Sequence, residues 1–89
     1  MKYLHLGKGT LVREDEILGI FDLDITSQSH LTRKFLSMAE KAGQVVNAAE
    51  DLPKSFVLCR REGQTRVYLS QMASATLLRR AEERGQLSE

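Results

Sequence analysis

The sequence predicts a small single-domain α+β protein, with two groups of short antiparallel strands (about six strands) and two helices in the order βββ-α-βββ-α. Short apolar stretches bounded by glycine are typical of strands joined by hairpins. Two longer stretches repeat apolar residues every three or four positions, as amphipathic helices do. The regular strand–helix alternation of a doubly wound parallel sheet is absent, which favours the α+β class.

The length of the chain limits it to one domain. Its 89 residues leave too little volume for a second hydrophobic core. We expect a single regulatory domain over residues 1–84 and a short polar tail over residues 85–89. A domain of this size buries only about 60–65% of the surface that its unfolded chain exposes, so self-association would add needed stability.

The first part of the chain predicts three strands. Strands over residues 3–6 and 10–12, separated by a glycine turn over residues 7–9, form a hairpin with a three-residue loop. The stretch over residues 17–21 is apolar on both faces, which predicts a central strand. Gly19 within this stretch indicates a bulge or a close backbone approach.

A helix follows, and Thr26 or Ser27 is its expected N-cap. Gly43 is well placed as the C′ residue that ends this helix. The apolar residues of the helix recur at spacings of three and four, so they form one stripe. The members of the stripe are Leu31, Phe35, Met38, Ala39 and Ala42.

The second half predicts three more strands and a final helix. A strand over residues 44–47 precedes the strand that begins at Ser55. A basic turn over residues 60–64, with Gly63 at its permissive position, leads into the next strand, and the last helix covers residues 74–84. Alternation in the hairpin strands predicts four pairs that each share a face: Phe56 and Leu58, Val57 and Cys59, Val67 and Leu69, Arg66 and Tyr68.

Catalytic and metal-binding patterns are missing from the sequence. It has no dinucleotide fingerprint, phosphate-binding loop or nucleophile elbow, so we expect neither an enzyme nor a cofactor. Asp22 and Asp24 lack the further ligands that a metal site needs, and solvation at a strand end explains them. His5 and His30 have no second ligand at a useful spacing. Cys59 lies in an apolar strand pattern, which predicts a buried thiol in a reducing compartment.

The amino-terminal stretch has no apolar run long enough for a signal peptide. No stretch approaches the roughly 20 apolar residues of a membrane helix. We therefore expect a cytoplasmic protein that does not interact with membranes.

The charge is unevenly distributed along the chain. Up to Pro53 there are six Lys or Arg against eight Asp or Glu, whereas from Lys54 to Arg84 there are seven against three. A basic segment on a nearly neutral protein favours a surface that faces a polyanion such as DNA. The candidate DNA-binding residues are Lys54, Arg60, Arg61, Arg79, Arg80 and Arg84.

Four stretches form an ordered series along the chain. They are Tyr3–Gly7 (YLHLG), Ile17–Asp22 (ILGIFD), Pro53–Val57 (PKSFV), and Leu69–Ser70 with Thr76–Ala81 (TLLRRA). This series resembles the bacterial extracellular matrix regulatory proteins of the RemA/RemB family, and its RemB-like branch in particular. The resemblance covers roughly residues 2–81 without large gaps.

The resemblance implies a small cytoplasmic transcription regulator of biofilm matrix genes. Members of the RemA type bind DNA and assemble as rings that display basic residues outward. Double-stranded DNA can then follow a curved surface on which many weak contacts add up to high avidity. The resemblance therefore implies a homo-oligomer, in the form of a ring, with double-stranded DNA as a partner.

The sequence departs from the RemA-type pattern at two places. An arginine pair just before the strand at Ser55 falls here on Leu52 and Pro53, with Lys54 as the only nearby base. A further arginine ahead of the third strand falls on Glu16, which reverses the charge. Two alternatives stay open: the remaining arginines bind DNA instead, or the protein is an oligomeric scaffold that regulates through protein contacts.

Overall fold

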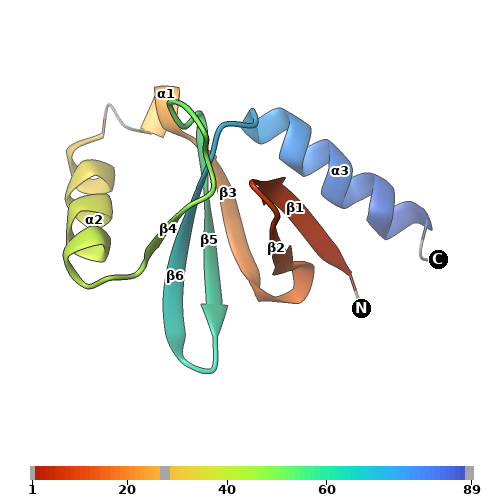
Figure 1. Cartoon of the computed structure of the whole chain (residues 1–89), viewed down its shortest axis with the longest axis horizontal. Helices are drawn as coiled ribbons and strands as arrows, with labels where there is room; N and C mark the ends of the chain where they lie inside the picture. The colour runs from red at the N-terminus through yellow and green to blue at the C-terminus, as the bar shows by residue number, and fades with distance from the viewer. Residues whose placement is uncertain (1, 27–28, 88–89) are drawn as a thin grey trace.

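The computed structural model of the chain describes the backbone of residues 2–26 and 29–87, and the side chains of all of these except 26 and 83–87. In chain order the elements are β1 (Tyr3–Gly7), β2 (Thr10–Arg13), the 3₁₀ turn η1 (Glu14–Glu16), β3 (Ile17–Asp22), α1 (Leu23–Thr26), α2 (His30–Lys41), β4 (Val45–Asn47), β5 (Ser55–Arg61), β6 (Gln64–Ser70) and α3 (Ser74–Leu87). A four-stranded sheet lies between α2 on one face and the β1–β2 hairpin with α3 on the other (Figure 1). The predicted α+β class is confirmed.

The strand order of the larger sheet is β3-β5-β6-β4. β5 pairs antiparallel with β3 and β6, but β4 runs parallel to β6, so not every strand pair is antiparallel as predicted. β3 also leaves the β1–β2 hairpin and joins the later strands. It is an edge strand, so its prediction as a central strand was wrong. Its apolar residues point to both faces of the sheet. An apolar pattern shows which faces are covered, but it does not show whether a strand has one neighbouring strand or two.

Gly19 produces the irregularity that the sequence predicts. The β3–β5 register shifts between Ile17 and Gly19. A Cβ atom at Gly19 would lie 2.7 Å from the ring of Phe21, which stacks on Phe56 with ring centroids 4.9 Å apart. The register shift confirms the predicted bulge, and the group that lies close to Gly19 is the ring of Phe21, not another backbone segment.

Both hairpins close through two-residue turns, which are shorter than predicted. Glu62 and Gly63 have φ angles of 51° and 80°, and a type I′ turn needs positive φ at both of its central residues. Arg60 and Arg61 therefore belong to β5, and Gln64 belongs to β6, although the sequence placed all three in the turn. The strands of the first hairpin are likewise joined by two residues instead of three.

The start of α2 also differs from the prediction. Ser29 is its N-cap, and the Ser29 Oγ accepts a hydrogen bond of 3.4 Å from the backbone N–H of Thr32. Thr26 ends the separate helix α1 and so does not cap α2, while Ser27 lies outside the described residues.

Asp22 explains why a separate helical turn forms first. Its Oδ1 accepts hydrogen bonds from the backbone N–H groups of Asp24 at 2.7 Å and Ile25 at 3.3 Å. This is the geometry of a helix N-cap, which satisfies donors that a helix start leaves unpaired. The carboxylate expected to be solvated at a strand end therefore starts α1.

The predicted end of α2 is confirmed. Gly43 has a φ of 72°, and its N–H donates to the carbonyl of Glu40 at 3.0 Å. The N–H of Gln44 donates to the carbonyl of Ala39 at 2.9 Å. These two bonds form a Schellman motif, which needs a left-handed residue at C′ and so favours glycine there.

The apolar stripe of α2 is only partly buried. Ala39 is buried and Leu36 packs beside it, but Leu31, Phe35 and Met38 are 76%, 39% and 60% exposed. α2 packs mainly over β4 and β6, and its stripe points sideways across the half of the sheet formed by β3 and β5. The stripe therefore borders an open apolar surface.

The two faces of the larger sheet carry two cores, as the predicted alternation along β5 and β6 requires. The core beneath the β1–β2 hairpin and α3 consists of Leu4, Leu6, Val12, Ala48, Val57, Cys59 and Leu77. The core beneath α2 consists of Ala39, Phe56 and Val67, with Leu36, Val45, Leu58 and Leu69 packed around them.

Helix α3 continues to Leu87, past the predicted domain boundary at residue 84. Within α3, Leu77 is fully buried and the next residue, Leu78, is exposed, as expected for the narrow apolar stripe of this helix. In the part of the chain that the structure describes, no helix has both the length and the apolar character to cross a membrane.

Two buried serines join the sheets and the start of α3. The Ser70 Oγ donates a 2.7 Å hydrogen bond to the carbonyl of Leu6 in β1 and accepts one of 3.1 Å from the N–H of Met72. Ser55 lies opposite Ser70 in the sheet, and its Oγ donates to the carbonyl of Met72 at 2.7 Å. Both serines are fully buried, so no water can replace these bonds without rearrangement.

Replacing Ser70 by alanine should lower the free energy of unfolding by about 2–3 kcal/mol. The change removes two buried hydrogen bonds and leaves the Leu6 carbonyl and the Met72 N–H unsatisfied. Urea denaturation followed by circular dichroism measures the loss. The matched control is Ser37→Ala at an exposed position of α2, which should change stability by less than about 0.5 kcal/mol. Equal effects of the two substitutions would contradict the structural role of Ser70.

Candidate nucleic-acid interface

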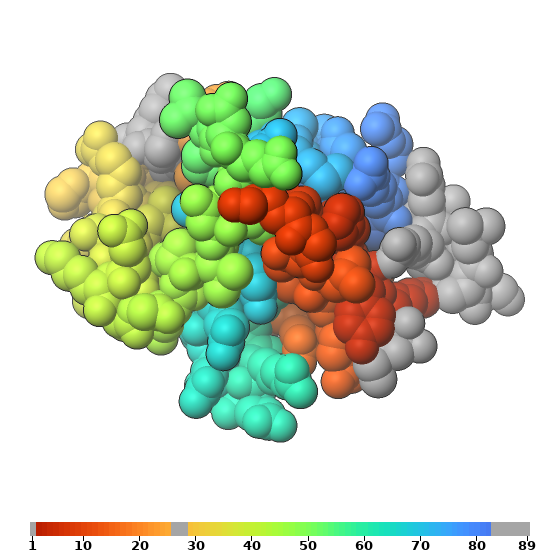
Figure 2. All heavy atoms as spheres, in the orientation of Figure 1, coloured from red at the N-terminus to blue at the C-terminus, as the bar shows by residue number. Residues whose placement is uncertain are grey.

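The candidate basic residues lie in three separate places. Lys54 immediately precedes β5, at one end of the larger sheet. Arg60 and Arg61 end the same strand, roughly 20–23 Å from Lys54 at the usual rise of about 3.3 Å per residue, near the tip of the β5–β6 hairpin, which projects from the rest of the molecule (Figure 2). Arg79 and Arg80 belong to α3, on the side of the molecule away from α2 (Figure 1). One protomer therefore does not gather these residues into one patch.

Arg60 and Arg61 project from opposite faces of β5, because side chains alternate along a strand. Arg60 is on the face of Leu58, which packs in the core beneath α2. Arg61 is on the face of Cys59, beneath the β1–β2 hairpin. Arg60 is exposed and forms no ion pair with another described residue.

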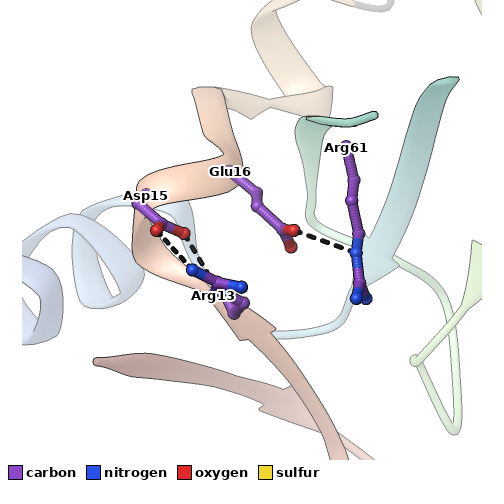
Figure 3. A network of polar contacts seen from close by, with 4 residues as sticks. All are labelled: Arg13, Asp15, Glu16 and Arg61. Carbon is purple, nitrogen blue, oxygen red and sulfur yellow. Dashed lines mark hydrogen bonds and ion pairs between the residues drawn. The ribbon is translucent and has the colours of Figure 1, made fainter. Parts of the chain in front are cut away.

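Arg61 is held by a carboxylate from η1. Its Nε lies 3.4 Å from a carboxylate oxygen of Glu16 (Figure 3). The Glu16 side chain is only 19% exposed, whereas that of Arg61 is 66% exposed. Glu16 therefore orients the guanidinium and offsets part of its charge, while both terminal nitrogens of Arg61 keep access to solvent or a ligand.

The arginines of α3 are exposed. Arg79 forms no ion pair with another described residue, and the Nη1 of Arg80 lies 3.7 Å from the sulfur of Met72. Arg84 is part of the last turns of α3, but its side chain lies outside the described part of the chain. Lys54 is also exposed, while its backbone N–H donates to the carbonyl of Ser70 at 2.8 Å.

A groove of about 470 Å³ opens beside Arg61, where the β1–β2 hairpin meets the end of the β5–β6 hairpin. We call it the hairpin groove. Three arginines line it from three strands, together with two tyrosines, two glutamates and the only cysteine. Its lining residues are Tyr3, Leu11, Val12, Arg13, Glu16, Cys59, Arg61, Glu62, Gln64, Arg66 and Tyr68.

The three arginines of the hairpin groove differ in how they are paired. Arg13 forms a bidentate pair with Asp15, with N–O distances of 2.7 and 3.1 Å (Figure 3). The hydrogen bonds to Asp15 and its charge raise the pKa of Arg13. Arg61 has Glu16, whereas Arg66 forms no ion pair with another described residue.

The position of Arg66 in the groove follows from the strand register. Arg66 lies opposite Cys59 and Gln64 lies opposite Arg61, so Arg61 and Arg66 are diagonal neighbours on one face. The predicted pairing of Arg66 with Tyr68 on one face is confirmed, since both line the groove. Arg13 joins them only through the packing of the two hairpins, which the sequence does not encode locally.

The histidines are exposed and lie apart from the hairpin groove. Among the side chains that the structure describes, no three of His, Cys, Asp or Glu come together as metal ligands would.

Comparison with known proteins identifies the family of this chain. A model of the RemA-like family, described as "Extracellular matrix regulatory protein A-like", matches residues 3–81. The chain belongs to the RemA-like family. It is also 32% identical over 80 residues to "Extracellular matrix regulatory protein B" of Bacillus subtilis (strain 168), and the match covers 90% of each chain. The suspected membership of the RemA/RemB family is therefore confirmed.

The positions at which the resemblance implies a departure from the RemA-type arginine pattern lie at opposite ends of the larger sheet. Leu52 is highly exposed and Pro53 is half-buried in the loop before β5. Glu16 instead lines the hairpin groove and pairs with Arg61. The negative charge of Glu16 is thus paired with the positive charge of Arg61.

Cys59 is buried at the floor of the hairpin groove, as predicted. Burial, and to a lesser extent the charge of Glu16, raise the pKa of its thiol to about 11. The thiol is therefore protonated at neutral pH, and it is a poor nucleophile because the thiolate is the reactive form.

The raised pKa of Cys59 predicts a pH dependence of stability. The unfolded chain loses the thiol proton near pH 9 and the folded chain near pH 11, so the stabilising contribution is complete below about pH 9 and is lost as the pH rises through about 11. The difference in unfolding free energy between the native chain and Cys59→Ala should shrink by up to about 2 kcal/mol between about pH 8 and pH 11. Urea denaturation of both proteins across this range measures it. A constant difference would show that the thiol titrates normally.

Proposed function

We propose that the protein is a bacterial, cytoplasmic and non-enzymatic regulator of extracellular matrix genes in biofilms, and that it acts on transcription as a homo-oligomer that contacts double-stranded DNA. Membership of a family of extracellular matrix regulatory proteins supports the biological role. The observation that supports DNA contact is the presence of exposed arginines that lie outside the hairpin groove and form no ion pair with another described residue. They are Arg60 at the end of β5 and Arg79 on α3.

Oligomerisation would solve the geometric problem that these arginines present. Each protomer offers a few separated cations, and each phosphate contact adds little affinity by itself. Copies arranged side by side, as in a ring, would repeat the same cations along a duplex and convert weak contacts into avidity. The candidate residues Lys54, Arg60, Arg61, Arg79, Arg80 and Arg84 then need not form one patch in a single protomer.

The open apolar surface beside α2 supports assembly. A groove of about 330 Å³ is lined by Phe21, Leu31, Phe35, Phe56 and Leu58, with Thr32 as its polar residue. Apolar surface of this kind in such a small domain is typical of a protein–protein contact site. A second copy is the occupant we propose, because a domain of this size gains stability by association.

A second candidate function is an oligomeric scaffold that does not bind DNA itself. Two observations favour it. Leu52 and Pro53 replace the arginine pair of the RemA-type pattern, and Glu16 reduces the charge that Arg61 presents to an anion. The two functions share the apolar surface and differ in the need for arginines, so charge reversal separates them.

Reversing the charge at both Arg60 and Arg61 should weaken DNA binding about tenfold or more. It should also lower the magnitude of the slope of log K against log salt by about two, because each lost phosphate contact removes nearly one unit. Gel-shift titrations of duplex DNA at several salt concentrations measure both quantities. The matched control is Arg33→Glu with Lys41→Glu, which removes the same charge from exposed positions on α2.

Equal weakening by the control pair would show that only net charge matters and would move the contact site away from the β5–β6 hairpin. No shift with the native protein at micromolar concentration and low salt would reject DNA binding and favour the scaffold. A regulator that binds specifically should instead form a complex that weakens steeply as salt rises.

Replacing Leu31 by aspartate should dissociate the proposed oligomer. A leucine buried at an interface contributes about 1.5–3 kcal/mol, so its loss should weaken self-association by about tenfold to a hundredfold. Size exclusion with light scattering, across a range of concentrations and with and without duplex DNA, measures the effect. The matched control is Leu78→Asp on α3, an exposed leucine that does not line this apolar groove. A native protein that stays monomeric at tens of micromolar would contradict assembly itself.

A further inference from the structure

The hairpin groove has features of a ligand site that the proposed duplex contact does not explain. Its volume of about 470 Å³ is within the range of small-molecule sites. Arg66 forms no ion pair with another described residue, although it lines a groove whose other two arginines each have a carboxylate. An uncommitted guanidinium beside two oriented ones is an arrangement that suits an anionic ligand.

Arg61 and Arg66 are placed to bind one phosphate group together. They are diagonal neighbours on one face of the β5–β6 hairpin, and such residues are typically about 7–8 Å apart. Their long side chains can therefore converge on a single phosphate. Glu16 contacts only the Nε of Arg61, which leaves the two terminal nitrogens available as donors (Figure 3). Two guanidinium forks can thus bind the phosphate oxygens with directed hydrogen bonds.

Aromatic rings line the same groove. Tyr68 is two residues from Arg66 on the same face and is half-buried, and Tyr3 enters from β1 with its ring partly exposed. A planar base gains stability by stacking on such a ring without the need for a specific sequence. The combination of arginine forks and tyrosine rings matches the two parts of a nucleotide, its phosphate and its base.

The carboxylates of the groove select among phosphates. Glu16 and Glu62 line it together with the arginines, and Asp15 neutralises Arg13 from outside the groove. Because the arginines and carboxylates nearly balance, the groove has little net charge to offset the hydration that an anion loses on binding, and this loss is larger for a monoester with nearly two negative charges than for a diester with one. We propose that the hairpin groove binds a phosphodiester-linked nucleotide, with its phosphate between Arg61 and Arg66 and its base against Tyr68.

This ligand chemistry has two sources, a single strand of nucleic acid and a small dinucleotide. The inference does not depend on the proposed duplex contact, which rests mainly on Arg60 and the arginines of α3. Among the described candidate DNA-binding residues, Arg61 alone also lines the groove. The probes that separate the sources are the dinucleotide TpT and a longer oligothymidylate. Inorganic phosphate is the control for phosphate alone, and thymidine monophosphate is the control for a phosphate monoester.

Titration of the ¹⁵N-labelled protein with each probe, followed by amide NMR shifts, tests the site. We expect TpT or the oligothymidylate to shift the amides of residues 61–68, and Arg66→Gln to weaken this binding about tenfold to a hundredfold. The matched control Arg79→Gln removes an exposed arginine of α3 and should leave the affinity unchanged. Arg66→Lys should restore only part of the affinity, because an ammonium group lacks the planar fork.

Binding of TpT as tight as that of the oligothymidylate would identify a small dinucleotide as the ligand, and binding of the longer strand alone would identify nucleic acid. The proposal is overturned if neither probe shifts the groove amides at millimolar concentration, if Arg66→Gln binds as well as the native protein, or if inorganic phosphate binds equally well. Duplex gel shifts with Arg66→Gln keep the two proposals apart, because this variant should lose TpT or oligothymidylate binding while most duplex affinity remains.

Discussion

The buried hydroxyl of Ser70 is the contact on which the arrangement of the molecule depends. The β1–β2 hairpin and the larger sheet form separate sheets, and Ser70 bridges them through the carbonyl of Leu6 while it also holds the N–H of Met72. Ser55 completes the junction through the Met72 carbonyl. The apolar core beneath the hairpin supplies most of the burial energy, but it is not directional. The hydroxyl bonds add direction, and they fix where the hairpin and α3 sit over the sheet. The position of the hairpin groove and of the arginines on α3 follows from this junction.

Local patterns predicted those parts of the fold that depend on neighbours in the sequence. The alternation along β5 and β6, the glycine that ends α2 and the bulge at Gly19 each depend on a few adjacent residues, and each was correct. The errors concern choices that distant residues decide. Whether β3 is central depends on which strands reach its edges, and the helical start before α2 depends on Asp22, which captures two backbone donors. The spacing of the α2 stripe was regular, but the sheet beneath the helix is wide enough to leave part of that stripe uncovered.

The same division applies to the candidate site. Charge counts along the sequence identified the basic second half of the chain but carried no information on pairing. Arg61 has a carboxylate partner 45 positions earlier in the chain, at Glu16, and Arg13 reaches the groove only because two hairpins pack together. In the sequence, the adjacent residues Arg60 and Arg61 suggest one basic patch. In a strand, however, their side chains project from opposite faces. Arg66 was visible from the predicted face that it shares with Tyr68, and this was the available signal for the groove.

The opposite orientations of Arg60 and Arg61 separate two kinds of anion contact at the end of one hairpin. Arg60 is exposed on the side of α2, where a long, flat polyanion can reach it without entering a cavity. Arg61 lines a groove with carboxylates, which is where we propose that a single phosphodiester binds. Under the two proposals, the ion pair with Glu16 weakens Arg61 as a contact for duplex DNA and orients the same guanidinium for a smaller ligand. This balance gives a physical reason for a glutamate at position 16 in a member of the RemA-like family. A change of residue at position 16 would then shift Arg61 between contact with duplex DNA and contact with a single phosphodiester, without a change in the fold.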